Sequence, residues 1–480
     1  MATSAAGALP LADQKPTVWL KLAHGLGAAA FGIKNNGFDY FLLLFYGTVI
    51  GLEPGLVGLA ILIALSFDAI SDPLVGYWSD NLRSRWGRRH PFMYAAAIPV
   101  ALSYFLLWNP PDLSQFGLFM YLTCLAILIR TFITFYETPS SALLPELTTD
   151  YDERTSLQSY RLFFGWVGGN GMSVLMFGVL LAGAGGMQSR EGFQTYGVVA
   201  SVMMLVVILI SAAATHHRIP SLSKPAVRTH SLGPRQIFKE MFETLSQRSF
   251  IALFVATIFS SVALGVSAAL GFLMLNYFWG FSEFQIFIWT CTVFFSALLG
   301  FLIAPFTAKR LGKKRATLVL GALAFSIQPL PVFLRLLGLM PENGDPILFP
   351  LVMAINVFDL ALIIAMQAVA LAMIADLVEA NQVKTGRRSE GVYYAASTFT
   401  RKTTQGLGVL GAGLILSAIN FPQGADPETV DPATLWRLGA MYAPTLLLLW
   451  TGALVAISRY KISKDGHQEN LRKLAANPEE

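Results

Sequence analysis

Long apolar stretches alternate with short polar ones along nearly the whole chain. Each stretch is close to the roughly 20 residues that an α-helix needs to cross a bilayer. The pattern predicts twelve spanning helices, at about 20–48, 54–79, 91–109, 116–145, 157–183, 195–215, 250–278, 284–306, 314–337, 347–376, 390–418 and 435–457. We therefore predict an all-α polytopic membrane protein.

A hydrated stretch divides the predicted helices six and six. The predicted organisation is a cytoplasmic tail at 1–19, a six-helix bundle at 20–215, a central cytoplasmic loop at 216–249, a second bundle at 250–457 and a cytoplasmic tail at 458–480. Charged residues make up only 13% of the chain, against roughly 25% in soluble domains. The net charge of +5 comes from Lys and Arg clustered between apolar runs. This placement indicates membrane orientation and not nucleic-acid binding.

The loop charges also predict the orientation. Basic clusters follow the even-numbered segments, whereas acidic residues gather in the opposite loops. The positive-inside rule then places both termini in the cytoplasm and the protein in the cell (inner, cytoplasmic) membrane.

Two of the basic loops carry a glycine at matching places in the two halves. Gly supplies a tight turn, and the paired positions favour a parallel repeat, as in major facilitator transporters. Ordinary positive-inside charge is the alternative for either loop alone. We predict conformational or gating roles for Arg85, Gly87, Arg88 and Arg89 after segment 2, and for Lys313 and Lys314 after segment 8.

Ionisable side chains inside the spans are candidates for function, because inserting one costs about 2.5–3.5 kcal/mol. Asp68 and Asp72 in segment 2 lie one turn apart on the same helix face. Such a pair suits Na⁺ or a shared proton, since binding either relieves the repulsion between the carboxylates. A solvated charge pair at the helix end is the alternative. Glu137 in segment 4 adds a carboxylate beside Pro139; its alternative is a pair with a neighbouring arginine.

Three other segments carry mid-span polar groups. Lys402 lies about 12 residues into segment 11, from where snorkelling to the surface is difficult. We expect Lys402 to pair with a carboxylate in the first half of the chain. A purely structural ion pair is the alternative. Asn36 and Asp39 share a face of segment 1 and are expected to line a cavity. Asp359 in segment 10 is a weaker candidate, because a local hydrogen bond is enough to explain a polar residue at this position.

The string that runs from Phe67 through Asp68, Asp72 and Pro73 to the Arg83–Arg89 turn resembles the glycoside–pentoside–hexuronide:cation symporter family of the major facilitator superfamily. Stretches at 137–145, 153–161 and 375–390 are also similar to that family, and they keep its order. The resemblance implies two six-helix bundles and cation-coupled uptake of a sugar or glycoside.

Carried over residue by residue, the resemblance places the cation site on Asp68, Asp72 and Thr134. Glu137 corresponds to a residue that serves both cation and sugar. A Na⁺ ion at Asp68 and Asp72 is one form of this site. Oxygen ligands serve Na⁺, H⁺ and Li⁺ alike, so these residues do not select among them.

The implied solute site departs from that of the melibiose permease, a member of this family. Gly32 stands where that permease has a sugar-binding Asp, and Ser141 where it has a stacking Trp, so a galactoside site does not transfer directly. Polar contact shifted along segment 1 to Asn36 and Asp39 is our hypothesis. The predicted solute-binding residues are Asn36, Asp39, Glu137, Arg161, Thr398 and Lys402.

We therefore expect a secondary active transporter that carries a sugar, glycoside or related small solute with Na⁺ or H⁺ by alternating access. We expect a monomer in the bilayer that needs no cofactor. A lysophospholipid or other amphiphile carrier of the same clan, and a non-transporting sensor on the same scaffold, are the alternatives. No Ser/His/Asp or Cys/His arrangement and no phosphate-binding glycine motif is evident in the sequence, so an enzyme is not expected.

Overall fold

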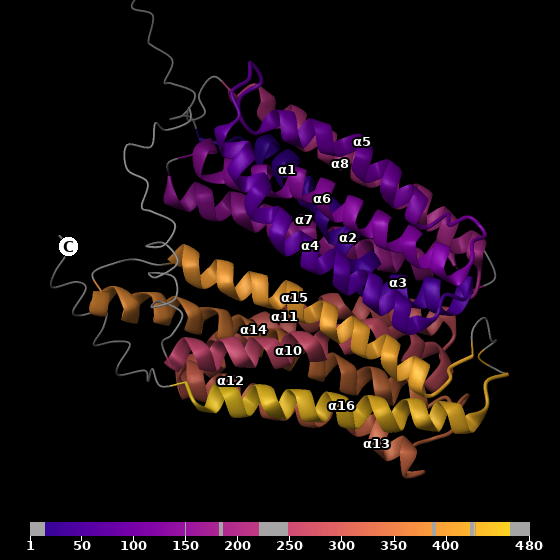
Figure 1. Ribbon diagram of the computed structural model, residues 1–480. Coiled ribbons are helices and arrows are strands. Elements are labelled where there is room, and N and C mark those ends of the chain that lie inside the picture. The colour runs from indigo at the N-terminus through magenta and orange to yellow at the C-terminus, as the bar shows by residue number, and fades with distance from the viewer. Residues whose placement is uncertain are drawn as a thin grey trace, which may run out of the picture. The chain divides into compact units, whose positions relative to one another are not determined.

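The computed structural model describes residues 15–148, 150–181, 186–219, 248–385, 390–422, 427 and 429–460. The α-helices are α1 Val18–Leu26, α2 Ala28–Asn36, α3 Leu42–Leu44, α4 Pro54–Asn81, α5 His90–Leu107, α6 Gln115–Leu147, α7 Tyr151–Leu175, α8 Arg190–His216, α10 Arg248–Leu273, α11 Glu283–Leu311, α12 Lys313–Ile327, α13 Leu330–Leu336, α14 Leu348–Thr385, α15 Glu390–Ala418 and α16 Pro432–Ser458. Short π-helical stretches are η1 Gly37–Phe41, η2 Phe45–Ile50, η3 Met176–Leu180 and η5 Met274–Phe278. Figure 1 shows the helices within each half of the chain running along one another.

Helices make up most of the described part of each of the twelve predicted segments, and the ninth is divided between α12 and α13. Ten helices among the described residues are long and apolar enough to cross a membrane. The first segment is divided into shorter helices, and within α15 the apolar helix found is the shorter Thr404–Ala418.

The helix of the tenth segment is longer than its apolar stretch. α14 contains 38 residues and ends at Thr385, nine positions beyond the predicted end at 376. At 1.5 Å per residue it is about 57 Å long, nearly twice the roughly 30 Å hydrocarbon core. Hydropathy marks where the apolar surroundings end, and the backbone of α14 remains helical beyond that point.

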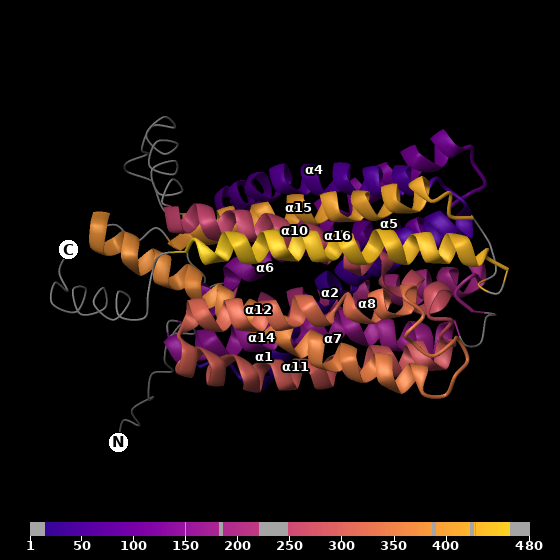
Figure 2. The ribbon, with the colours of Figure 1, turned by 90° about the horizontal axis from the view of Figure 1, so that it is seen from below.

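The chain forms two compact units. Unit 1 comprises Met1–Leu52 and Leu59–Arg228, and unit 2 comprises Glu53–Gly58 and Thr229–Glu480. In each unit the first segment packs against the fifth and sixth, and the third against the fourth and sixth. These pairs are α2–α7, α1–α8, α5–α6 and α5–α8 in unit 1, and α10–α15, α10–α16, α12–α14 and α12–α16 in unit 2. Figure 1 shows α5 beside α8, and Figure 2 shows α10 beside α16. Such recurrence is expected of the predicted parallel repeat.

The first segment of each unit contains π-helical turns. In unit 1, η1 and η2 flank the short α3, and Asp39 lies within η1. In unit 2, α10 ends in η5. A π-turn widens the helix locally and is frequent at functional sites. The widened turn thus coincides with one of the polar groups predicted in segment 1.

Glycines allow α2 and α7 to approach each other closely. A Cβ atom on Gly32 would lie 1.8 Å from the carbonyl oxygen of Gly165 and 2.9 Å from the backbone nitrogen of Gly169. A Cβ on Gly168 would lie 2.6 Å from that of Ala29. Small residues spaced in this way bring membrane helices together. Gly32 is therefore a helix-contact position without room for a side chain.

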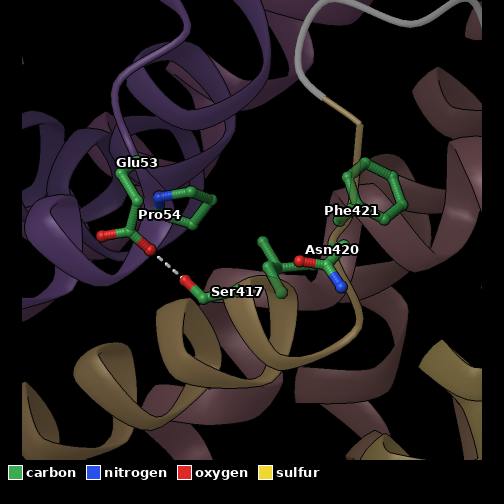
Figure 3. Close-up of a pocket in the computed structure, with 6 residues that line it drawn as sticks. Glu53, Pro54, Ser417, Asn420 and Phe421 are labelled. Atoms are coloured by element: carbon green, nitrogen blue, oxygen red, sulfur yellow. Dashed lines mark hydrogen bonds between the residues drawn. The ribbon is translucent and has the colours of Figure 1, made fainter.

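Glu53 caps the first turn of α4 within unit 2. Its carboxylate accepts hydrogen bonds from the backbone N–H groups of Gly55 at 3.0 Å and Leu56 at 2.9 Å, and from the hydroxyl of Ser417. Figure 3 shows the Glu53–Ser417 pair beside a pocket that Pro54, Leu416, Asn420 and Phe421 also line. Burial raises the pKa of the Glu53 carboxyl, and the three hydrogen bonds lower it. The hydrogen bonds together have the larger effect, so the net pKa lies below the ordinary value for glutamate.

Glu53→Gln is expected to lower the free energy of unfolding at pH 7 by about 0.5–1 kcal/mol, because a charged cap at a helix N-terminus is lost. A lowered carboxyl pKa stabilises the fold above the unfolded-state pKa. This contribution disappears as the pH falls through the folded-state pKa, which lies below the ordinary value for glutamate. Melting temperatures of wild type and variant should therefore converge on acidification. Glu342→Gln, at an exposed loop carboxylate, is the control, and a constant gap at all pH values would contradict the prediction.

Candidate functional site

Two carboxylates on α4 face a hydroxyl and a guanidinium on α6. The Thr134 hydroxyl lies 3.2 Å from Asp68 Oδ1 and 2.8 Å from Asp72 Oδ1. Arg130 Nη1 donates to Asp68 Oδ2 at 3.2 Å. Asp68, Arg130 and Thr134 are buried, and Asp72 is half-buried. The structure thus brings together three of the four residues predicted for the cation site, all except Glu137, and it adds Arg130.

Sequence analysis missed Arg130, although a signal was present. Arg130 lies four residues before Thr134 and seven before Glu137, so all three share one face of α6. Its guanidinium also lies over the ring of Phe38 in η1, with Cζ 4.8 Å from the ring centroid. Burying an arginine in the middle of an apolar segment costs about as much as burying a carboxylate, so Arg130 was an equally strong candidate for a functional residue.

A second ion pair lies further along α6. Glu137 Oε1 accepts a hydrogen bond from Arg161 Nη2 at 2.6 Å, and Arg161 Nη1 donates to the Ser140 hydroxyl at 2.7 Å. The Arg161 side chain is 4% exposed, and that of Glu137 is 26% exposed. Two predicted solute residues therefore contact each other across α6 and α7. This contact matches the alternative stated for Glu137, a pair with a neighbouring arginine.

The remaining predicted solute residues lie on three elements. Asn36, the last residue of α2, donates to the Ser173 hydroxyl of α7 at 3.2 Å. Asp39 is half-buried on η1. Thr398 and Lys402 lie on α15, and their side chains fall outside the described part of the structure.

Asp359 lies near the middle of α14 in unit 2. Its side chain is 3% exposed, and its Oδ1 has no hydrogen-bond partner among the described residues. The local hydrogen bond that we considered for this residue therefore does not involve Oδ1.

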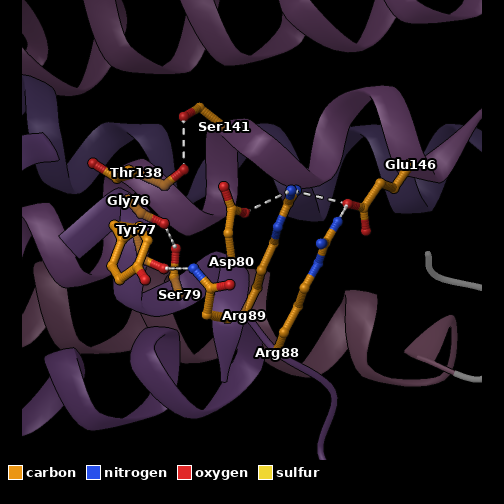
Figure 4. A network of polar contacts seen from close by, with 10 residues as sticks. Gly76, Tyr77, Ser79, Asp80, Arg88, Arg89, Thr138, Ser141 and Glu146 are labelled. Carbon is orange, nitrogen blue, oxygen red and sulfur yellow. Dashed lines mark hydrogen bonds and ion pairs between the residues drawn. The ribbon is translucent and has the colours of Figure 1, made fainter. Parts of the chain in front are cut away.

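The predicted gating residues of unit 1 form a network at the turn between α4 and α5. Arg89 Nη2 lies 2.9 Å from Glu146 Oε1 on α6 and 3.3 Å from Asp80 Oδ1 on α4, and Arg88 also pairs with Glu146 (Figure 4). Gly87 has φ +72°, the left-handed backbone that the predicted tight turn needs. Arg85 is exposed. The turn thus links the ends of α4 and α6.

The matching turn in unit 2 has its own glycine. Gly312 has φ +77°, and Lys313 Nζ donates to the carbonyl of Ala372 on α14 at 3.5 Å. Lys314 is half-buried in the first turn of α12. Among the described residues, no group of three or more His, Cys, Asp or Glu side chains is placed to hold a metal ion.

The fold is that of major facilitator transporters. The solved structure of the nucleoside transporter NupG has a TM-score of 0.60 to this chain, covering 92% of this chain and 99% of its own, at 14% identity. This likeness shows the fold, and the apolar spans among the described residues show a multi-pass membrane protein.

The chain belongs to the MFS/sugar transport protein family, whose profile matches residues 23–464. The putative glycoside/cation symporter YagG of Escherichia coli K12 is 24% identical over 92% of this chain and 92% of its own. The isoprimeverose transporter of Lactiplantibacillus pentosus is 26% identical over 83% and 80%. The sodium-dependent lysophosphatidylcholine symporter 1-A of Danio rerio is 33% identical, over 30% of this chain and 27% of its own.

Proposed function

We propose that this protein carries a sugar, glycoside or related small solute across the cell membrane together with a monovalent cation. Family membership supports this solute class, and so do the names of the two relatives that match most of the chain, YagG and the isoprimeverose transporter. One observation carries the proposal: Asp68 and Asp72 share the Thr134 hydroxyl inside the apolar part of unit 1. Burying two carboxylates together is costly unless cations compensate them.

Reciprocal coupling follows from this arrangement. A cation bound at Asp68 and Asp72 lowers the repulsion between them and favours the conformation that holds the solute. Glu137, Arg161, Asn36 and Asp39 are proposed to contact the solute, together with Thr398 and Lys402. By linkage, the solute then raises cation affinity by the same factor. Release of both on the other side completes alternating access.

The basic turns are proposed to control the conformational change from the cytoplasmic side. In unit 1, Arg88 and Arg89 hold Glu146 on α6 against the turn after α4. Opening on that side would separate these charges, and closing would restore them. Lys313 and Lys314 would act at the equivalent turn of unit 2, and both termini would face the cytoplasm.

The test is uptake by proteoliposomes that contain the purified full-length chain. A panel of labelled glycosides, pentosides and disaccharides is offered under an imposed Na⁺ gradient or an imposed pH gradient. Accumulation of at least one solute above its external concentration, dependent on either gradient, is expected. A panel in which no gradient drives any solute would overturn the proposal.

A partial likeness to a lysophosphatidylcholine symporter supports a second candidate solute. It covers less than a third of the chain, so the sugar class has the wider support. Adding labelled lysophosphatidylcholine to the same panel separates the two. Its uptake, with no sugar transported, would favour the amphiphile alternative.

Arg161→Gln is expected to lower the free energy of unfolding by about 1–3 kcal/mol, because it leaves the half-buried Glu137 charge unpaired. Arg190→Gln is the matched control in the same unit. Arg190 pairs with Asp112 at 3.0 Å, but the side chains are 44% and 94% exposed, and such pairs contribute about 0–1 kcal/mol. Thermal unfolding in detergent compares the two. Equal losses of stability would contradict the prediction.

A further inference from the structure

We propose that Arg130 determines which ion the carrier accepts: its guanidinium occupies the cation position at Asp68 and keeps Na⁺ out of the site. This inference rests on the proposed symport. It assigns a specificity role to a residue outside the predicted cation set.

Arg130 is held at the site from two sides. Nη1 donates to Asp68 Oδ2 at 3.2 Å, and the guanidinium lies over the Phe38 ring, 4.8 Å from Cζ to its centroid. The side chains of Arg130 and Asp68 are 4% and 3% exposed. Carboxylate pairing and aromatic stacking are the two interactions that a planar guanidinium makes best. Arg130 therefore acts as a built-in monovalent cation on Asp68.

A metal cation at this place would meet two obstacles. Na⁺ needs several oxygen ligands at once, and Asp68 Oδ2 is already bound to Arg130. A Na⁺ between the two carboxylates would also lie close to the guanidinium, and like charges repel strongly where water is excluded. Binding Na⁺ would first require Arg130 to move away from both Asp68 and Phe38.

Other charged groups lie on the elements that form the site. Glu137 on α6 pairs with Arg161 of α7, Asp39 lies on η1 beside Phe38, and Lys34 lies one turn before Phe38 on α2. The proposal concerns the ion at Asp68 and Asp72 and assigns no titration to these neighbours.

The experiment uses the full chain in lipid nanodiscs with Na⁺ as the probe. Melting temperatures are measured in equal concentrations of NaCl and choline chloride. Wild type is expected to melt at the same temperature in both. Arg130→Gln removes the charge and should bind Na⁺ at least about tenfold more tightly, or about 1.4 kcal/mol, which appears as a Na⁺-specific rise.

Two variants control this result. Arg130→Lys keeps the positive charge and should likewise show no Na⁺-specific rise, whereas Arg130→Gln combined with Asp68→Asn should lose the rise seen in Arg130→Gln. A wild type stabilised by Na⁺ as much as Arg130→Gln would overturn the proposal. So would a folded Arg130→Gln protein that Na⁺ does not stabilise.

Wild-type transport decides the question even where Arg130→Gln does not fold. A pH gradient at equal Na⁺ should drive uptake, and a Na⁺ gradient at equal pH should not. Uptake driven by Na⁺ would overturn the role of Arg130 and leave the proposed symport intact. No uptake under either gradient would instead be a failure of the proposed function.

Discussion

Asp68→Asn is expected to abolish cation-driven accumulation and to leave solute exchange across the membrane intact. Asparagine has the size of aspartate, and its oxygen still accepts the hydrogen bond from Arg130, so the solute path is preserved. It carries no charge, and the carboxylate that the coupling ion requires is lost. The measurement compares gradient-driven uptake with counterflow, in which labelled solute exchanges for unlabelled solute without any ion gradient.

The matched control for this variant is Asp112→Asn. Asp112 also pairs with an arginine in unit 1, but its side chain is 94% exposed. The Asp112→Asn protein should accumulate solute as wild type does. Unchanged accumulation by Asp68→Asn would show that this carboxylate is not part of the coupling site.

Gly32→Asp, which restores the residue found in the melibiose permease, is expected to prevent folding. The first side-chain atom would lie 1.8 Å from the Gly165 carbonyl oxygen, and backbone atoms cannot move aside as a flexible side chain can. α2 and α7 would have to separate, exposing the glycine surface that joins them. The yield of monodisperse protein after detergent extraction measures this effect.

Gly171→Ala, on the same helix α7, is the control for steric tolerance. A Cβ atom there would meet nothing within 4 Å, so yield should equal that of wild type. Even Gly32→Ala should fail, because the clash involves Cβ itself. Normal yield for Gly32→Ala would contradict the close approach of α2 and α7.

Hydropathy predicted the spans well because lipid selects for apolar length. It was less informative where backbone geometry changes within an apolar run. The π-turns of segment 1 leave no hydropathy signal, since Phe41 and Phe45 are as apolar as any helix residue. The apolar part of α14 agrees with the predicted segment, but hydropathy did not predict the continued helix up to Thr385, since a helix can leave the apolar region without ending.

The polar site was predictable in part. Asp68 and Asp72 were identified from the cost of burying them, and Thr134 from the family resemblance. Arg130 was overlooked because the search for a cation site considered only acidic residues. The free-energy cost of burial applies equally to an arginine. Gly32 looked like a missing ligand, whereas the structure shows a packing position; only three-dimensional contacts distinguish these two roles.

The central claim is that solute and cation cross together and that the cation is bound by Asp68, Thr134 and Asp72. Its most direct test adds the transported solute to proteoliposomes that have no ion gradient and records cation movement with a pH-sensitive or Na⁺-sensitive dye inside. Wild type should take up cation with the solute, and Asp68→Asn should exchange solute without any ion signal. Solute entry into wild-type vesicles with no accompanying cation would contradict the account.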